Sequence, residues 1–490
     1  MSKFVLSPNE NAKFLLRNVS VVVLGLFANQ LLETFGGIAL GACGSNAAKD
    51  SGSSPSASAG ASASPSPSAA NAAAQEKTKL AYWTAERGRA DFLKDTVKRY
   101  NETNKDNIEV EITIFADNYA QAVDAAYAGG TAPDIINVSG VGTLGTLVAK
   151  NYLEPLDSYL TPELKKQNES LLKEGVNTLQ GKIYSLPNQG STYRLLYNVD
   201  LLNKAGYAKP PETLDELVDA AKKITQAGKA EGVYGFALPY KSPASALSRS
   251  AAVIASLTGY EKSGFDFKTG KYDFSGYAEI IQAFRQMWVD GSTFPGSEST
   301  DIDPLKAQFA EGKIGFLLSS SNEPGVFKTQ FPAKIKWAAA TVPTGKGVRG
   351  GAAYMTGGTW YGISKQSKNK DKAWKFLSYM YGDQVLTESQ EVAGWLSMVP
   401  AIVAKAKLPD IPGTEYFLPG KYDAIWPQPP ENIVPEGKNS DQAFVDYIIA
   451  GGNLDKIIQG LNDSYNAALS RSGQKVTPNP SFNPSQLQQK

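Results

Sequence analysis

Acid–base chemistry in this chain has to rest mainly on carboxylates, because its 490 residues include no histidine and a single cysteine. Histidine is the commonest general base, and histidine and cysteine are the usual zinc ligands. Ser-His-Asp and Cys-His catalysis, zinc sites and haem attachment are therefore excluded together. Paired carboxylates, in contrast, can hydrolyse glycosidic bonds. The candidates for such a pair are Glu86, Asp117, Asp301 and Asp303, and we expect no metal and no cofactor.

Three of the seven tryptophans lie where a ligand could reach them. Trp83 ends an apolar strand pattern, Trp360 follows Gly357-Gly358-Thr359, and Trp395 follows Gly394. Ligands of open α/β folds bind at the carboxyl ends of strands, and an indole face suits the apolar face of a pyranose ring. Each of the three could equally fill a core. Helical stripes and a strand pattern assign Trp288, Trp374 and Trp337 to the core, whereas Trp426 stays open.

Cys43 closes the run Leu40-Gly41-Ala42-Cys43 behind a basic, apolar N-terminal segment. A small-residue site after an apolar stretch is typical of a secretory signal, so we expect residues 1–43 to be a signal whose Cys43 is lipidated. The alternative is a free thiol in an uncleaved membrane helix, and Glu33 interrupts the apolar stretch. Residues 44–76 are rich in Ser, Ala, Gly and Pro, which predicts a flexible tether spanning on the order of 30 Å.

The charge balance limits the partners. Forty-nine basic and forty-eight acidic residues give a formal net charge of +1, which argues against a chain-wide nucleic-acid partner. The length favours more than one domain or lobe.

Strand and helix patterns alternate from Lys77 onward. Strands are expected at 80–83, 108–115 and 134–138, with helices over 92–100 and 120–127 between them. This order is typical of a doubly wound α/β sheet. The pattern continues with a capping box at Thr213 and Glu216, a helix over 280–288, a helix capped by Asp303 before Pro304, a strand over 314–318 and helices over 370–381 and 454–469.

The segment Gly140 to Gly145 matches the dinucleotide fingerprint GxGxxG after a strand. No second long strand with an acidic end follows it, as such a site requires. We therefore interpret it as a simple glycine-rich turn.

Several segments, in order, resemble the extracellular solute-binding proteins of the sugar-binding branch that serve ABC importers. They are Ala81-Tyr82-Trp83, Gly130 to Ile135, Tyr184 to Pro187, Leu195 to Leu202, Phe309 to Lys313, Gly357 to Trp360 and Ala373 to Leu377. Two positions depart from the pattern: Arg194 replaces a small residue, and Ser319 to Asn322 replaces a stretch that often carries a stacking tryptophan.

The resemblance implies a two-lobed periplasmic-binding-protein type II fold, each lobe a mixed sheet flanked by helices, with the ligand cleft between the lobes. One lobe would comprise residues 77–187 plus 359–403 and the other 188–358 plus 404–471, followed by a disordered tail, 472–490. The expected ligand contacts are Trp83, Glu86, Gln189, Tyr193, Tyr240, Trp360 and Trp395.

The function implied is capture of a sugar or oligosaccharide by lobe closure and its delivery to the permease subunits of an ABC transporter. The protein would be a monomer held by its lipid anchor at the extracellular face of the cell membrane, and no enzyme. The alternatives are an exported carbohydrate-active enzyme that uses two of the four carboxylates, and a scaffold or adhesion lipoprotein.

Overall fold

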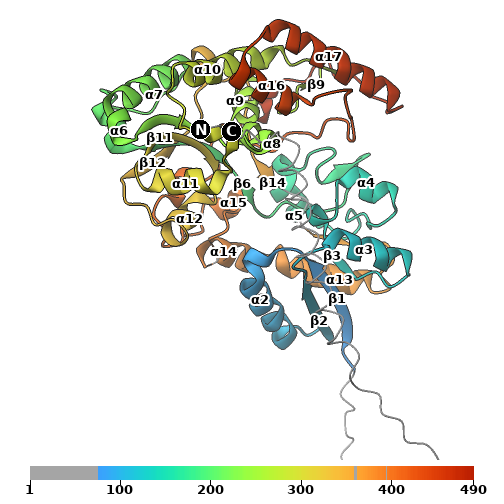
Figure 1. Ribbon diagram of the computed structural model, residues 1–490. Coiled ribbons are helices and arrows are strands. Elements are labelled where there is room, and N and C mark those ends of the chain that lie inside the picture. Colours follow the sequence, from blue (N-terminus) through green and yellow to red (C-terminus); the bar gives the residue numbers. More distant parts are fainter. Residues whose placement is uncertain (1–75, 358–360, 393, 490) are drawn as a thin grey trace, which may run out of the picture. The chain divides into compact units, whose positions relative to one another are not determined.

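The computed structural model describes residues 76–357, 361–392 and 394–489. These residues fall within one compact unit, Ala74–Lys490, and their two largest sheets have four strands each. Helices surround each sheet (Figure 1), so the predicted α/β class is confirmed. No helix in the described part of the chain has the length and apolarity needed to cross a membrane.

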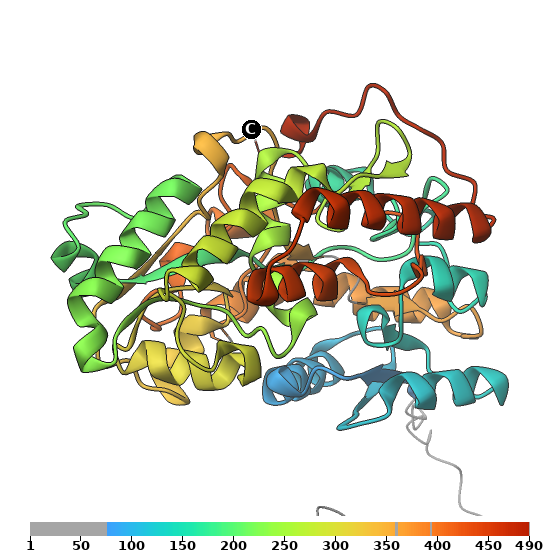
Figure 2. The same cartoon turned by 45° about the horizontal axis from the view of Figure 1, so that its top comes forward.

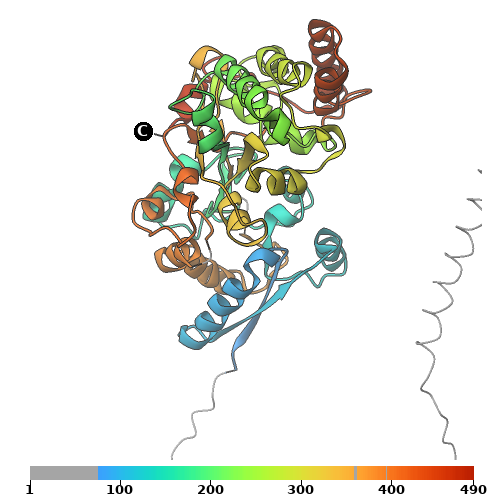
Figure 3. The same cartoon turned by 60° about the vertical axis from the view of Figure 1, so that its left-hand side comes forward.

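The first sheet has the order β15-β3-β1-β2. Strands β1 and β2 are parallel along their whole length, β1 and β3 are parallel, and β15 is antiparallel to β3. Helix α2 lies along β2 (Figure 3). The predicted strands and helices of this region are confirmed, with these bounds: β1 (Thr78–Thr84), α2 (Ala90–Thr103), β2 (Ile108–Ile114), α3 (Tyr119–Ala128), β3 (Ile135–Asn137) and α13 (Lys370–Met380). The region also contains β15 (Tyr361–Ile363) and α14 (Asp383–Glu391).

The second sheet has the order β12-β7-β11-β8. Strand β7 is antiparallel to both of its neighbours, whereas β11 and β8 are parallel. Helices α16 and α17 lie on the outside of this group, α16 against α10 (Figure 2). The elements are β7 (Tyr193–Asn198), α6 (Val199–Lys204), α7 (Leu214–Gly228), β8 (Tyr234–Ala237), α8 (Pro243–Ser248), α9 (Ala251–Thr258), α10 (Ala278–Val289), α11 (Ile302–Ala310), β11 (Ile314–Ser320), α12 (Glu323–Thr329), β12 (Trp337–Ala340), α16 (Ser440–Ala450) and α17 (Leu454–Arg471).

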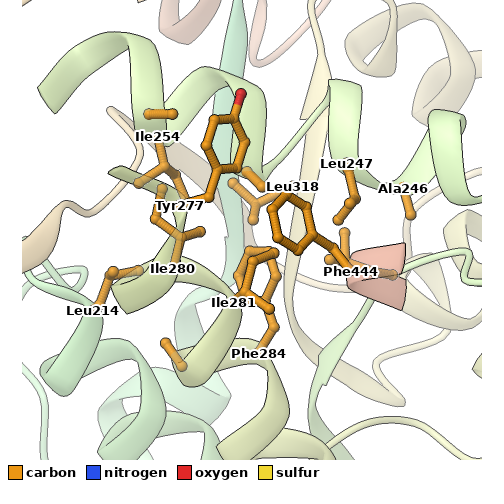
Figure 4. Packing of buried hydrophobic residues seen from close by; sticks show 14 of the residues in the cluster. Leu214, Ala246, Leu247, Ile254, Tyr277, Ile280, Ile281, Phe284, Leu318 and Phe444 are labelled. Carbon is orange, nitrogen blue, oxygen red and sulfur yellow. The ribbon is translucent and has the colours of Figure 1, made fainter. Parts of the chain in front are cut away.

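Apolar stripes of α7, α9, α10 and α16 build the core on the second sheet. The predicted capping box is present, because the Thr213 hydroxyl accepts from the Glu216 amide and the Glu216 carboxylate accepts from the Thr213 amide. Figure 4 shows the rings of Tyr277 and Phe444 together in this core, with centroids 5.5 Å apart. Trp426 is also buried, and its indole N–H donates to the Ala352 carbonyl.

One helix start differs from the prediction. Helix α11 begins at Ile302 with Asp301 as the capping residue, so the cap assigned to Asp303 is wrong. Asp303 lies in the first turn, where its carboxylate pairs with Lys306 at 3.2 Å. Carboxylates anywhere in the first turn are favourable beside the helix dipole, which is why sequence alone misplaces such a start by two residues.

Two chain segments that join the sheets run side by side. Strand β6 (Gly190–Ser191) pairs with β14 (Thr356–Gly357) in antiparallel register. A Cβ atom on Gly190 would lie 1.7 Å from the Thr356 carbonyl oxygen, so only glycine allows this approach. The other short strands are β4 (Thr178–Leu179) with β5 (Lys182–Ile183), β9 (Phe265–Asp266) with β10 (Lys271–Tyr272), and β13 (Ala353–Tyr354) with β16 (Asp423–Ala424).

The described part of the C-terminal tail, 472–489, makes contacts with the rest of the chain, and the disorder expected for it stays a prediction. The Phe482 ring packs against Phe267 and Trp426, with centroids 4.9 and 6.1 Å away. The side-chain amide of Gln488 donates to the carbonyls of Arg349 and Gly351. The half-buried Phe482 ring thus gives this polar segment an apolar contact with the rest of the chain.

Candidate functional site

Two adjoining cavities, of about 420 and 520 Å³, lie beside the paired strands β6 and β14. Their lining comes from the turn after β3, from the residues of β13 and β14, and from residues Gln428–Asn432, which we call the strap. The residues common to both cavities are Thr143, Tyr354, Thr356, Gln428 and Glu431. Cavities of this size suit small ligands.

The wall on the first-sheet side is the glycine-rich turn. Its interpretation as a simple turn is confirmed, because β3 is followed by a single turn of 3₁₀ helix, Val138–Gly140, and by the short helix α4 (Leu144–Ala149). The Thr143 hydroxyl caps α4 by accepting from the Thr146 amide. The turn therefore presents hydroxyl groups at the carboxyl end of a parallel strand, where α/β folds bind ligands.

The strap forms the opposite wall and touches both sides of the cavities. It follows β16 and the buried Trp426. The Gln428 amide donates to the Glu174 carbonyl at 3.0 Å, and the Thr143 hydroxyl donates to the Glu431 carboxylate at 2.5 Å. These bonds join the proline-containing strap to Glu174 and to the glycine-rich turn.

Aromatic and polar groups meet on the second-sheet side. The Tyr193 and Tyr354 rings are stacked, with an interplanar angle of 21° and centroids 6.4 Å apart. Burial raises the pKa of Tyr193 to about 12, so its hydroxyl stays a hydrogen-bond donor at neutral pH. The ammonium of Lys262 lies 4.2 Å from the centre of the Tyr354 ring. Aromatic faces next to hydroxyl and amide groups are the combination that carbohydrate binding needs.

Asp441, in the first turn of α16, lines the larger cavity and has a shifted pKa. Burial raises the pKa of its carboxyl from 3.8 to about 6. In an unfolded chain an aspartate has a pKa of about 3.9, so the folded state binds the proton more tightly.

This shift predicts a pH-dependent stability. A raised folded-state pKa means that the folded chain binds more protons between pH 4 and 6, so the free energy of unfolding should fall as pH rises through that window. Relative to wild type, Asp441→Asn should gain about 2 kcal/mol between pH 4 and pH 7, after allowance for partial exposure. Urea unfolding at a series of pH values measures this, with the exposed Asp463→Asn as control. A pH-independent difference would contradict it.

Two of the predicted contacts, Glu86 and Gln189, belong to a buried network at the end of β1. Arg89 pairs with the Glu86 carboxylate at 3.0 Å, and the exposed fractions of the two side chains are 3% and 8%. The Tyr361 hydroxyl donates to the same carboxylate at 3.0 Å, and the Gln189 amide group donates at 3.2 Å. The Glu86 carboxylate therefore forms its ion pair and its hydrogen bonds within this network.

The aromatic residues predicted as contacts lie apart from one another. Tyr193 lines the larger cavity. Trp83 is half-buried with its ring 5.0 Å from that of Phe115, and Trp395 lies 5.6 Å from the Arg89 guanidinium. Tyr240 is only 2% exposed and packs edge-on against Trp288. Trp360 and Cys43 lie outside the described residues.

The remaining candidate carboxylates bind cations or face solvent. Asp301 accepts from Lys241 and from Ser242, Asp303 pairs with Lys306, and Asp117 is exposed. Within residues 76–357, 361–392 and 394–489, no hydrogen bond joins two of these carboxylates, and no group of three or more metal-ligating side chains occurs.

Sequence reasoning missed most residues of the two cavities. Tyr354 and Lys262 lie in segments without a strong pattern, and the strap follows the one tryptophan that stayed unassigned. The glycine-rich turn was a usable signal, because it follows a strand at its carboxyl end.

Comparisons with known proteins agree with this architecture. Residues 57–386 match the family described as bacterial extracellular solute-binding protein. A binding protein of Brucella abortus is 29% identical over 296 residues, which cover 59% of this chain and 68% of that protein. The sn-glycerol-3-phosphate-binding periplasmic protein UgpB of Agrobacterium fabrum is 26% identical over 350 residues, 67% of this chain and 76% of its own.

A solved structure shows the same fold. The cyclic α-maltosyl-1,6-maltose binding protein of Arthrobacter globiformis matches with a TM-score of 0.62 at 18% identity, and the match covers 81% of this chain and 100% of its own. The predicted two-lobed α/β fold is confirmed by this likeness.

Proposed function

Because the chain belongs to the bacterial extracellular solute-binding proteins, we propose that it captures a sugar or oligosaccharide between two lobes and delivers it to the permease subunits of an ABC transporter. The observation that carries this proposal is the pair of adjoining cavities beside the paired strands β6 and β14. Tyrosine rings, hydroxyl groups and amide groups line these cavities. Such a lining can stack on sugar rings and bond their hydroxyl groups.

The proposed lobes are residues 77–187 plus 359–403 and residues 188–358 plus 404–471. Two features support this division: β15 returns to the first sheet, and β6 and β14 run together between the sheets. Closure of one lobe on the other would bury the ligand, and the ligand stabilises the closed form by binding it better.

Capture without bond cleavage is favoured over hydrolysis. The carboxylates predicted from the sequence as a catalytic pair are drawn from Glu86, Asp117, Asp301 and Asp303, and none of these four lines the two cavities. Three of the four are held by lysine or arginine. A glycosidase needs one carboxyl free to donate its proton.

A ligand screen tests the proposal. Residues 77–490 are heated with maltotriose, raffinose, galactobiose and sn-glycerol 3-phosphate, because a compound that binds the folded chain raises its melting temperature. Calorimetry should then give one-to-one binding of a sugar, and mass spectrometry should recover that sugar unchanged. Cleavage products that accumulate with time would favour the enzyme, and binding of no sugar would contradict the proposal.

Ligand contacts are proposed at Tyr193 and Tyr354 in the cavities and, as predicted from the sequence, at Trp83, Glu86, Gln189, Tyr240, Trp360 and Trp395. Alanine variants of each, measured by calorimetry against the sugar found in the screen, separate true contacts from residues that only support the fold. A true contact should lose affinity at an unchanged urea midpoint.

Lipidation of Cys43 is the proposed route to the extracellular face of the cell membrane. Two acyl chains anchor a protein stably, whereas one does not. In the native host, Cys43→Ala should move from the membrane fraction to the soluble fraction, while Ser45→Ala should stay with the membrane. Equal membrane partitioning of Cys43→Ala and wild type would show that the apolar segment itself holds the chain.

A further inference from the structure

The larger cavity has a cation without a carboxylate partner at its second-sheet end. The Lys262 ammonium lies over the Tyr354 ring, 4.2 Å from its centre. Within the described residues, no carboxylate oxygen lies within 4.0 Å of it, since it takes part in none of the ion pairs found there. A cation–π contact fixes the position of the ammonium without neutralising its charge.

The adjacent carboxylate, Glu261, is turned away into the protein. It is 3% exposed, and its Oε2 accepts from the Ser263 amide at 2.6 Å. Burial raises the pKa of Glu261 above its usual value. The charge of Glu261 acts on Lys262 and raises its pKa, but the two side chains form no ion pair among those found in the described residues.

A second cation, Arg249, lies on the Tyr193 side of the tyrosine pair. Its guanidinium donates to the Ser245 carbonyl, the Ser245 hydroxyl and the Ser319 hydroxyl, all neutral groups. The nearby Glu323 is already bound by Lys306 at 3.2 Å. The two tyrosines are thus flanked by positive charge on the second-sheet side.

The carboxylates of this cavity lie on the strap and on α16. Glu431 bonds to Thr143 across the cavity, and burial is the cause of the raised pKa of Asp441. Burial opposes the charged form of Lys262, while Tyr354 and Glu261 raise its pKa. Glu431 and Asp441 line the same cavity as Lys262, but within the described residues neither forms an ion pair with its ammonium.

We propose that this cavity takes a sugar that carries an acidic group, a carboxylate or a phosphate, and that Lys262 holds that group. The inference rests on the proposed function and narrows its substrate class. The ammonium of Lys262 loses water because it is partly buried, and an anionic group on the sugar would take the place of that water. The bond between them would be a charge-assisted hydrogen bond, which is roughly twice as strong as a neutral one. A neutral sugar leaves Lys262 without an ion-pair partner, which gives discrimination between the two.

Matched pairs of neutral and acidic sugars test this proposal on residues 77–490. Calorimetry compares galactobiose with digalacturonate and glucose with glucose 6-phosphate. We expect the acidic member of at least one pair to bind about tenfold or more tightly than its neutral partner, the scale of one charge-assisted contact. The uronate and phosphate arms show which acidic group is preferred.

Variants of Lys262 assign the preference to this side chain. Lys262→Met should remove the preference for the acidic sugar, so that the ratio of the affinities for the acidic and the neutral member of a pair falls by about tenfold or more. Lys262→Arg should keep the preference, as should Lys271→Met, the exposed lysine control. The melting temperature of each variant, measured without sugar, reports whether it is folded.

Three outcomes overturn the inference. The first is that neutral sugars bind and no acidic one binds better. The second is that folded Lys262→Met keeps the acidic preference. The third is that no sugar of either kind binds, and only in that case does the proposed function fail as well.

Discussion

Replacing Arg194 with methionine should lower the free energy of unfolding by about 3–5 kcal/mol, the cost of removing one partner of a buried ion pair. Its guanidinium makes two 2.7 Å bonds to the two carboxylate oxygens of Asp423, and the exposed fractions of the two side chains are 6% and 5%. The same group donates to the carbonyls of Tyr416 and Leu418. Arg194 thereby ties β7 to the segment that leads into the strap.

A urea midpoint series checks this expectation. Arg99→Met is the matched control, because its pair with Glu388 is 37% and 28% exposed and should cost less than about 1 kcal/mol. The double variant Arg194→Met with Asp423→Leu should recover part of the loss, since no buried charge is then left alone. A cost below about 1 kcal/mol for Arg194→Met would show that water compensates Asp423.

Glu86→Ala should have an effect of similar size, about 3–5 kcal/mol, because it leaves the charge of Arg89 buried without a counter-ion. Arg89 is 4% exposed, and the Tyr361 hydroxyl would also lose its acceptor. Glu111→Ala is the matched control, since its pair with Lys79 is 58% and 67% exposed.

The same variant separates the roles proposed for Glu86. If its carboxylate mainly supports the fold, the urea midpoint falls and the variant that is still folded keeps most of its affinity for the sugar found in the screen. Loss of affinity at an unchanged midpoint would instead make Glu86 a ligand contact. The hydrogen bonds that Glu86 accepts from Arg89, Tyr361 and Gln189 favour a role in supporting the fold.

Local pattern was sufficient for most of the fold. The alternation of Ile108 to Ile114 marks a strand with one buried face, and the capping box at Thr213 marks a helix start. Both depend on neighbours within a few residues, so they can be read without knowing the tertiary structure. The start of α11 was misplaced because Asp301 and Asp303 are both reasonable first-turn residues.

The site was less predictable, for a physical reason. Tyr193 was expected in it and lines the larger cavity. The larger cavity is also lined by Lys262, Tyr354 and Glu431, which are far apart in the sequence. Their segments come together only because strands β6 and β14 pair and the strap lies beside them. No local periodicity encodes a contact of that kind.

Amino-acid composition already limits the chemistry that is available to this protein. A chain without histidine and with one cysteine lacks the usual groups for metal and nucleophilic catalysis, whatever its fold. Which charged side chains form ion pairs, and which do not, depends on the folded arrangement of the chain. Arg194 meets Asp423 and Arg89 meets Glu86, whereas Lys262 meets a tyrosine ring. Composition counts charges, but pairing depends on distances of a few ångströms, which folding alone sets.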